Sequence, residues 1–266
     1  AFFPGCWPDA AGPISRTRFT KRVACSFSAP ATQDTVGRAY RRMKERAVVL
    51  LSGGLDSATS LYVARSAGCD CISLAFDYGQ RHRFELQMAK RQSMKAGCLE
   101  HLQIRIDPSL FAGSALTDGS LDVPEHDEGA TGIPITYVPG RNILFLAHAL
   151  SLAESRQCGA IYTGANVLDY SGYPDCRPDF FAAFTRMAEL GTRMGVEGRA
   201  VEIRCPLITL NKKQIIELGM TLGVDYSLTS SCYNPDPGGK PCGRCDSCHF
   251  RARGFGEANL IDPILA

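Results

Sequence analysis

A short stretch of small and polar residues, residues 51–57 (LSGGLDS), follows an apolar run and leads into a segment with helical patterning. Its two adjacent glycines let the backbone approach a polyanion closely, and its serines offer hydroxyl and backbone N–H donors. The helix that follows directs the positive end of its dipole at the same point. We therefore predict a turn that binds nucleotide phosphates, and the residues expected to contact the nucleotide are Leu51, Ser52, Gly53, Gly54, Leu55, Asp56, Ser57, Ala58, Thr59 and Ser60.

This turn differs from the phosphate loop of the common NTPases, because no lysine follows its glycines and the acid Asp56 lies inside it. Its Ser-Gly-Gly-x-Asp-Ser pattern resembles that of the PP-loop ATP pyrophosphatase superfamily, whose members use ATP to adenylate an oxygen of a substrate. That resemblance implies that the serines and glycines hold the phosphates, while Asp56 acts through a magnesium ion or an ordered donor. The alternative is a plain strand-to-helix connection in which Asp and Ser only cap the helix.

A second group of residues with metal-ligand spacing lies near the C-terminal end, where the pattern Cys-x9-Cys-x2-Cys-x2-Cys is formed by Cys232, Cys242, Cys245 and Cys248. Pro and Gly residues between these cysteines let the chain fold back sharply. Four thiolates can enclose one zinc ion, and because the protein then fills every coordination position, we predict one structural zinc per chain. Two alternatives stay open: an iron–sulfur cluster, although the usual Cys-Pro is missing, and free or disulfide-bonded cysteines.

The elements that must position these residues alternate between short β-type runs and longer helical segments. Strands are expected at residues 47–51, 71–76, 101–106, 160–163 and 201–204, and helices at residues 57–67, 84–96, 142–158, 178–194 and about 212–222. This alternation predicts an α/β fold, a parallel sheet flanked by helices (adenine nucleotide alpha hydrolase-like, Rossmann-like), followed by the four-cysteine zinc-binding segment.

In such sheets, ligands bind outside the carboxyl ends of the strands, so the segments that follow the strands should carry the site. Residues 77–82 follow the second expected strand and residues 164–177 follow the fourth, and both segments are rich in hydrogen-bonding side chains. Residues 107–136 form a long, weakly periodic connection, which is either a surface excursion or a lid over the site.

Composition and charge divide the chain of 266 residues into three parts. We predict a leader at residues 1–46, disordered or non-native upstream sequence, for which an organelle transit peptide is the alternative. An ATP-binding α/β domain then covers residues 47–225, and a zinc-binding segment packed on it covers residues 226–266. The whole chain has a net charge of +2, and its leader carries nine Lys and Arg against three Asp and Glu. Residues 47–266 therefore have a net charge of −4. Because phosphate neutralisation supplies most non-specific affinity for nucleic acids, this charge disfavours an RNA-gripping surface.

The sequence also argues against a membrane protein and against an oxidising compartment. No apolar run approaches the roughly 20 residues that a membrane-spanning helix needs, and no signal-like apolar core lies near the start. In the absence of such a signal, the 12 cysteines favour free thiols in a reducing compartment. We therefore expect a cytoplasmic protein.

Taken together, five blocks of sequence resemble the 7-cyano-7-deazaguanine synthase family over residues 47–263; they are residues 52–57, 77–80, 138–142 and 170–178 and the four cysteines. The resemblance implies an ATP-dependent ligase that converts 7-carboxy-7-deazaguanine and ammonia into 7-cyano-7-deazaguanine (preQ0) in queuosine biosynthesis. ATP activates the carboxylate, ammonia displaces the activated oxygen to give an amide, and a second activation dehydrates the amide to the nitrile. The resemblance further implies Mg2+ with the ATP and a homodimer. The α/β pattern leaves no room for a glutamine-hydrolysing domain, so we expect ammonia to arrive free. The charge and the short apolar runs predict no direct contact with nucleic acid or membrane.

Single side chains near the strand ends are assigned roles on the same basis. Arg141 is expected to contact a phosphate or the substrate carboxylate, because its planar fork suits either. Asp169 and Asp175 are expected to accept hydrogen bonds from the guanine-like edge. With Asp56, these residues form the expected catalytic set; the alternatives are a surface or helix-capping arginine and turn-forming aspartates. Further candidates, each with a purely structural alternative, are His82 for proton transfer, Tyr170 and Tyr173 for stacking, Lys212 for nucleotide binding and Cys176 as a nucleophile.

Two other functions compete with this interpretation. A tRNA-thiolating PP-loop enzyme would use its cysteines for sulfur transfer or for an iron–sulfur centre, but the negative charge of residues 47–266 argues against it. An ATP-gated sensor would bind nucleotide without turnover. Release of the nitrile product would separate the enzyme from the sensor.

Overall fold

Five strands form one parallel sheet in the computed structural model, which describes residues 44–168 and 172–265. Across the sheet the order is β3 (Glu100–Arg105), β2 (Asp70–Asp77), β1 (Arg46–Leu50), β4 (Ala160–Tyr162) and β5 (Glu202–Arg204), and every neighbouring pair is parallel. The strand order reverses at β1, which pairs with β2 on one side and β4 on the other. The predicted α/β fold with a parallel sheet is confirmed, and its switch point lies at the carboxyl ends of β1 and β4.

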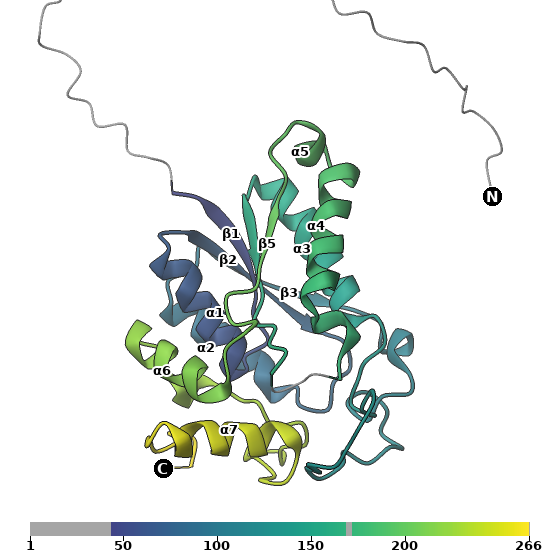
Figure 1. The fold of residues 1–266 in the computed structure, drawn as a ribbon, viewed down its shortest axis with the longest axis vertical. Coiled ribbons are helices and arrows are strands. Elements are labelled where there is room, and N and C mark those ends of the chain that lie inside the picture. The colour runs from purple at the N-terminus through teal and green to yellow at the C-terminus, as the bar shows by residue number, and fades with distance from the viewer. Residues whose placement is uncertain (1–43, 169–171, 266) are drawn as a thin grey trace, which may run out of the picture. The chain divides into compact units, whose positions relative to one another are not determined.

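Helices cover both faces of this sheet (Figure 1). They are α1 (Leu55–Ser66), α2 (Phe84–Lys95), α3 (Arg141–Arg156), α4 (Pro178–Gly191), α5 (Arg193–Val196), α6 (Lys212–Leu222) and α7 (Asp246–Glu257), with short 3-10 turns at Pro108–Phe111, Pro174–Cys176 and Tyr226–Leu228. Successive side chains of β1 point to opposite faces of the sheet, as in any β-strand. Val48 packs with residues of α3 and α4, whereas Ala47 and Val49 pack with residues of α1 and α2.

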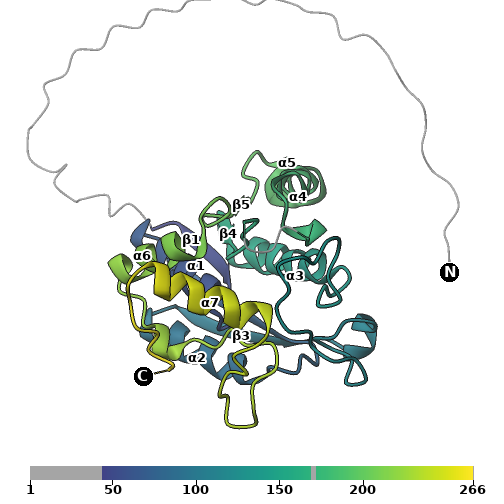
Figure 2. The same ribbon diagram turned by 60° about the horizontal axis from the view of Figure 1, so that its bottom comes forward.

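The C-terminal helices extend the layer formed by α1. Helix α6 packs on α1, and α7 packs on α6, as Figure 2 shows with α7 in yellow. Their shared core includes Leu55 and Ala58 of α1, Ile215 and Ile216 of α6, and Phe255 of α7. This packing brings the segment with the four cysteines beside the first residues of α1.

Two local details differ from the sequence-based expectation. The helix expected at residues 178–194 ends at Gly191, because Thr192 adopts an extended conformation and its hydroxyl accepts a hydrogen bond from the Gly195 N–H, which starts α5. At the end of α3 the left-handed position is taken by Gln157 (φ 54°), not by Gly159. The helix therefore ends at Arg156, two residues before the expected end at residue 158.

The long connection at residues 107–136 is an excursion anchored at both its base and its tip. At the base, the Ala115 N–H donates to the carbonyl of Ile135, and the Arg81 guanidinium donates to two carbonyls within the excursion. At the tip, the His126 N–H donates to the carbonyl of Arg244, and the His126 ring lies 2.8 Å from a carboxylate oxygen of Asp246.

Among the described residues, no helix combines the length and apolar character required to cross a bilayer.

Candidate active site

The glycine-rich turn links β1 to α1 and is held in a conformation that requires glycine at its centre. Gly53 has a φ of +93°, and a methyl group there would lie 2.0 Å from the carbonyl oxygen of Glu85. The carbonyl of Gly53 accepts a hydrogen bond from the N–H of Ser230, and the N–H of Leu55 donates to the hydroxyl of Ser231. The turn is therefore clamped between α2 and the segment that precedes the first cysteine of the cluster.

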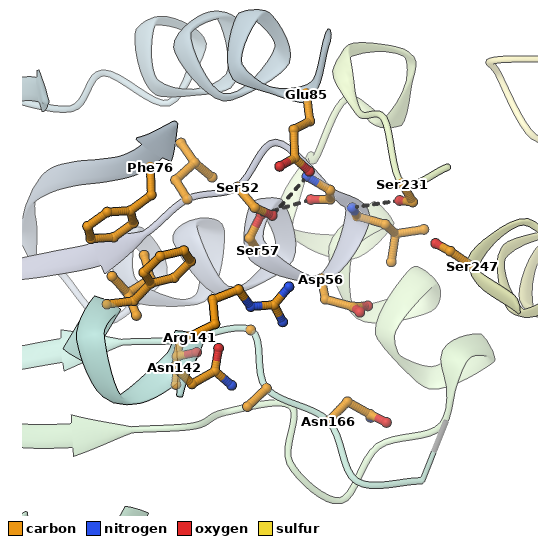
Figure 3. Close-up of a pocket in the computed structure, with 18 of the residues that line it drawn as sticks. Ser52, Asp56, Ser57, Phe76, Glu85, Arg141, Asn142, Asn166, Ser231 and Ser247 are labelled. Atoms are coloured by element: carbon orange, nitrogen blue, oxygen red, sulfur yellow. Dashed lines mark hydrogen bonds between the residues drawn. The ribbon is translucent and has the colours of Figure 1, made fainter. Parts of the chain in front are cut away.

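The hydroxyls of this turn lie together. The Oγ atoms of Ser52 and Ser57 are 3.0 Å apart, the N–H of Gly54 donates to Ser52, and the Ser57 hydroxyl donates to the carbonyl of Gly54 (Figure 3). A ring of hydroxyl and backbone donors at the start of a helix suits a phosphate group. Phosphate binding by this turn stays a prediction, which the arrangement of these donors supports.

A cavity of about 250 Å3 opens beside the turn, at the switch point of the sheet. It is bounded by the carboxyl ends of β1, β2 and β4 and by residues from α1, α3 and the segment at residues 230–233. Of the ten residues expected to contact the nucleotide, six line this cavity: Leu51, Ser52, Gly54, Leu55, Asp56 and Ser57. Its position agrees with the general rule for parallel α/β sheets.

Gly53 and the first helical residues beyond Ser57 support the turn from behind instead of lining the cavity. Ala58 is fully buried, the Thr59 hydroxyl bonds to the Leu55 carbonyl and the Tyr226 hydroxyl, and the Ser60 hydroxyl donates to the Thr163 carbonyl. These hydroxyls are used inside the protein, and the buried side chains hold the turn in place. The sequence motif runs without a break from Leu51 to Ser60, so it could not distinguish these supporting residues from the residues that line the cavity.

Asp56 faces a buried lysine across the mouth of the turn. The ammonium group of Lys212 donates to both carboxylate oxygens, at 2.8 and 2.9 Å, and only 6% of its side chain is exposed. Lys212 is the first residue of α6, so the pair joins elements 156 residues apart in the chain. A buried cation at this place can serve a nucleotide phosphate as well as the carboxylate.

Arg141 and its neighbours form the opposite wall of the cavity. Its guanidinium donates to the hydroxyl of Tyr78 at 3.4 Å, and Figure 3 shows it directed toward the turn. Burial raises the pKa of Tyr78 to about 12, so this phenol stays neutral. Arg141 therefore presents its positive charge to the cavity without a carboxylate partner among the hydrogen bonds described.

Asp175 lies beside the start of α3 and does not line the cavity. One of its carboxylate oxygens accepts from the Asn142 N–H at 3.2 Å, while the other is buried without a hydrogen bond among the described residues. Burial raises the pKa of this carboxyl group. Asp169 and Tyr170 lie outside the described residues, so their expected contacts stay predictions.

Tyr173 and Cys176 line the cavity, but neither is arranged as a reactive group. The Tyr173 hydroxyl lies 2.8 Å from that of Thr136, which fixes the ring against the long excursion. Burial raises the pKa of the Cys176 thiol to about 11. Because the thiolate is the nucleophilic form, this environment does not favour Cys176 as a nucleophile.

His82, which lies between β2 and α2, and Glu85, in the first turn of α2, also border the cavity, and Glu85 was missed by the sequence analysis. Burial lowers the pKa of His82 to about 4, and the field of Arg141 acts in the same direction. Glu85, which received no role, is 7% exposed and lines the cavity near Ser52. A Glu in the first turn of a helix is ordinarily a solvent-exposed group that the helix dipole stabilises. Nothing in the sequence around Glu85 therefore indicated a functional role.

The four cysteines come together as the spacing predicts. Their sulfur atoms all lie within 4.8 Å of one another, and those of Cys242 and Cys248 are 4.0 Å apart. Zinc–sulfur bonds of about 2.3 Å in a tetrahedral site separate the sulfurs by about 3.8 Å, so this donor set fits one such ion. The backbone N–H groups of Asn234 and Cys242 point at the Cys232 sulfur, as is usual around metal-bound thiolates.

Comparisons with known proteins place this arrangement in a family. Residues 46–259 match the family model described as "Queuosine biosynthesis protein QueC". A 7-cyano-7-deazaguanine synthase from Cellvibrio japonicus (strain Ueda107) is 54% identical over 220 residues, which are 83% of this chain and 97% of that protein. A protein of the same name from Alcanivorax borkumensis is 55% identical over 219 residues, which are 82% of this chain and 98% of that protein.

Among solved structures, the NMN synthetase from Francisella tularensis aligns with a TM-score of 0.42 and 19% identity, over 82% of this chain and 78% of that one. A likeness of this degree says nothing about the substrate. The family match rests on the sequence relatives, which this chain covers along nearly their whole length. The chain therefore belongs to the family of queuosine biosynthesis protein QueC.

Proposed function

We propose that this chain is an ATP-dependent ligase that converts 7-carboxy-7-deazaguanine and ammonia into 7-cyano-7-deazaguanine. The observation that supports this most strongly is the glycine-rich turn at the switch point of the sheet, faced by Lys212 and Arg141, in a chain whose relatives are named for this activity. The tRNA-thiolating alternative is not favoured, because those relatives are synthases of the free base and match along nearly their whole length.

The chemistry requires that a carboxylate oxygen become a leaving group. The carboxylate attacks the α-phosphate of ATP and pyrophosphate departs; ammonia then forms the C–N bond while the C–O bond to AMP breaks. The resulting amide oxygen is activated in the same way, and loss of AMP and of the N–H protons leaves the nitrile. Fixed donors that meet the developing phosphate charge, here the turn with Arg141 and Lys212, supply electrostatic stabilisation and positioning.

The proposal also assigns roles to Mg2+, to two aspartates and to a zinc ion. Mg2+ would neutralise phosphate charge, held by the phosphates and by Asp56 once Lys212 turns toward the nucleotide. Asp175 lies outside the lining of the cavity, but its buried oxygen without a hydrogen bond among the described residues supports a contact with the donor edge of the base, and Asp169 precedes it in the same segment. The sulfur geometry supports a zinc ion with a structural role, because four thiolates leave no open coordination position.

The state of the protein in the cell is part of the same proposal. None of the ten described cysteines forms a disulfide bond, which supports a reducing, cytoplasmic location. A homodimer is what the family resemblance implies, and Leu190 of α4 and Val196 of α5, which are 64% and 78% exposed, are candidate interface residues. Sedimentation of the purified protein measures the oligomeric state directly.

Product analysis tests the proposed activity. The zinc-loaded protein is incubated with 7-carboxy-7-deazaguanine, ammonium and ATP, and the products are identified by mass spectrometry. We expect the amide to appear first and the nitrile to accumulate, with ATP consumed at each stage. ATP hydrolysis without either product would instead support the ATP-gated sensor.

Substitution of Lys212 by Met tests the pairing at the mouth of the turn. The variant keeps the length and apolar packing of the side chain and removes the cation that contacts Asp56. Loss of a charge-assisted phosphate contact that strengthens in the transition state is expected to lower kcat/KM for ATP by about 10²- to 10³-fold. Lys213→Met is the matched control, because Lys213 lies next to it on the exposed side of α6, where it pairs with Glu217; equal activity of both variants would contradict the role of Lys212.

A further inference from the structure

Glu85 is a buried carboxyl group that borders the cavity and has no role in the reaction as proposed above. It lies in the first turn of α2, is 7% exposed, and shares the cavity with Ser52 and Arg141 (Figure 3). Carboxylates are almost never buried to this degree unless they are paired or have a function. No arginine or lysine forms an ion pair with Glu85 among the described residues.

The surroundings of Glu85 fix one of its oxygens and leave the other available. The Gln80 side-chain NH2 donates to Oε1 at 3.2 Å, and Gln80 is itself held by the carbonyl of Phe76 and the N–H of Tyr78. Nε2 of His82 lies 3.4 Å from the same Oε1. No hydrogen bond within the described part of the chain reaches Oε2. The carboxyl group is thus oriented by two neighbours while one oxygen remains for a ligand.

The charged and titratable groups that face this carboxyl are His82, Tyr78 and Arg141. Burial keeps His82 and Tyr78 neutral, with pKa values of about 4 and about 12. For Glu85, burial raises the pKa from 4.5 to about 8, although the Gln80 hydrogen bond and Arg141 act in the opposite direction. A carboxyl group in this environment exchanges a proton near neutral pH, which suits a general base.

The reaction proposed above needs such a base, and the inference rests on that proposed function. Dissolved ammonium has no lone pair, so it cannot attack an acyl carbon until it loses a proton. Phe76, Phe145 and Leu116 line the same cavity and give part of it an apolar wall. Such a wall favours neutral ammonia over the ammonium ion once the proton is gone.

We propose that Glu85 captures ammonium at the cavity and acts as the base that converts it to ammonia. An N–H bond of ammonium breaks and an O–H bond forms at Oε2. The freed lone pair then forms the C–N bond at the acyl carbon, while the C–O bond breaks and AMP leaves with that oxygen. A second proton leaves the new amide nitrogen, so ammonium and acyl adenylate give amide, AMP and two protons.

Glu85→Gln tests this role, because glutamine has nearly the same shape and cannot accept the proton. Carboxylate-dependent exchange of pyrophosphate into ATP reports the activation step and is expected to be unchanged. kcat/KM for ammonium is expected to fall by about 10²- to 10⁴-fold, the usual contribution of a positioned base. Hydroxylamine is largely unprotonated at neutral pH, so the variant should convert it to the hydroxamate at the wild-type rate. Glu100→Gln, which removes a half-exposed partner of Arg156, is the control.

Stability supplies a readout that is independent of turnover. Because folding raises the pKa of Glu85 from 4.5 to about 8, the folded protein binds a proton that the unfolded chain releases, and stability is lost as pH rises through that range. Glu85→Gln removes this loss. Its Tm relative to the wild type should therefore increase with pH between about 4.5 and 8. In the pH profile of turnover with ammonium, the rise near pH 8 should be present in the wild type and absent in Glu85→Gln.

The outcomes separate this inference from the proposed function. If the wild type shows neither exchange nor nitrile, the proposed function is wrong. If exchange is normal in both proteins but Glu85→Gln uses ammonium as well as the wild type, the base is another group. An equal loss with ammonium and hydroxylamine, or a loss of exchange, would mean that Glu85 positions the turn or the nucleotide. Glu85→Asp, which keeps an acid one methylene shorter, gives a partial loss with ammonium alone and covers the case in which Glu85→Gln does not fold.

Discussion

Replacement of Gly53 by alanine is expected to lower turnover by about 10²-fold while leaving most of the protein folded. The added methyl group would lie 2.0 Å from the carbonyl oxygen of Glu85 and 2.8 Å from the backbone nitrogen of Ala89, so the turn or α2 must move. A displacement of about 1 Å in a group that positions a reacting atom costs on the order of 10²-fold in rate. The left-handed backbone adds strain on the order of 1–3 kcal/mol. Steady-state kinetics and thermal unfolding measure both effects.

Gly68→Ala is the matched control for Gly53→Ala. Gly68 has a similar φ of +85°, but it lies beyond the end of α1 and a methyl group there meets no atom within 4 Å. It should therefore lose stability through backbone strain alone and keep its activity. If Gly53→Ala is as active as Gly68→Ala, close packing of the turn against α2 is not required for catalysis.

Removal of the metal from the four-cysteine cluster is expected to inactivate the enzyme and to unfold its C-terminal segment. Metal binding by a four-ligand zinc site contributes about 10 kcal/mol or more to folding, which is comparable with the whole stability of a domain, about 5–15 kcal/mol. The loss should reach the active site, because Ser230 and Ser231 form hydrogen bonds with the glycine-rich turn and the next residue is Cys232 of the cluster.

Cys245→Ser, or treatment of the wild type with a strong chelator, tests this coupling. Both should release zinc, lower Tm and stop carboxylate-dependent pyrophosphate exchange, and zinc should restore only the chelated wild type. Cys98→Ser provides the control, because Cys98 is a half-buried free thiol outside the cluster. A chelated protein that keeps its exchange activity would show that the cluster does not support the turn, and iron with a visible absorption band would show that the metal is not zinc.

The fold and the local motifs could be predicted from the sequence because their signals are short-range. Apolar runs such as residues 47–50 and the adjacent glycines report directly on a strand and on the turn that follows it. The four cysteines carry their own spacing, and their sulfurs do meet. The family resemblance drawn from these blocks is confirmed by the match over residues 46–259.

The remaining features depend on contacts between distant segments. Lys212 looked equally suited to the surface, and its burial depends on Asp56, 156 residues earlier. Glu85 resembles any acid in a first helical turn, and its burial depends on the approach of α2 to the glycine-rich turn. The docking of His126 beside Asp246 likewise joins an excursion of no regular pattern to the cysteine segment. Periodicity cannot encode such pairings, because they arise from tertiary packing.

The central claim is that ATP activates oxygen atoms of the substrate carboxylate at the glycine-rich turn, and isotope transfer tests it most directly. 7-Carboxy-7-deazaguanine with both carboxylate oxygens replaced by ¹⁸O is converted with ammonium and ATP, and the nucleotide products are analysed by mass spectrometry. We predict one ¹⁸O in each of two AMP molecules per nitrile formed, and release of labelled AMP about 10²-fold slower in Gly53→Ala. Unlabelled AMP together with unlabelled inorganic phosphate would contradict activation of the carboxylate oxygen, and label in inorganic phosphate would contradict attack on the α-phosphate.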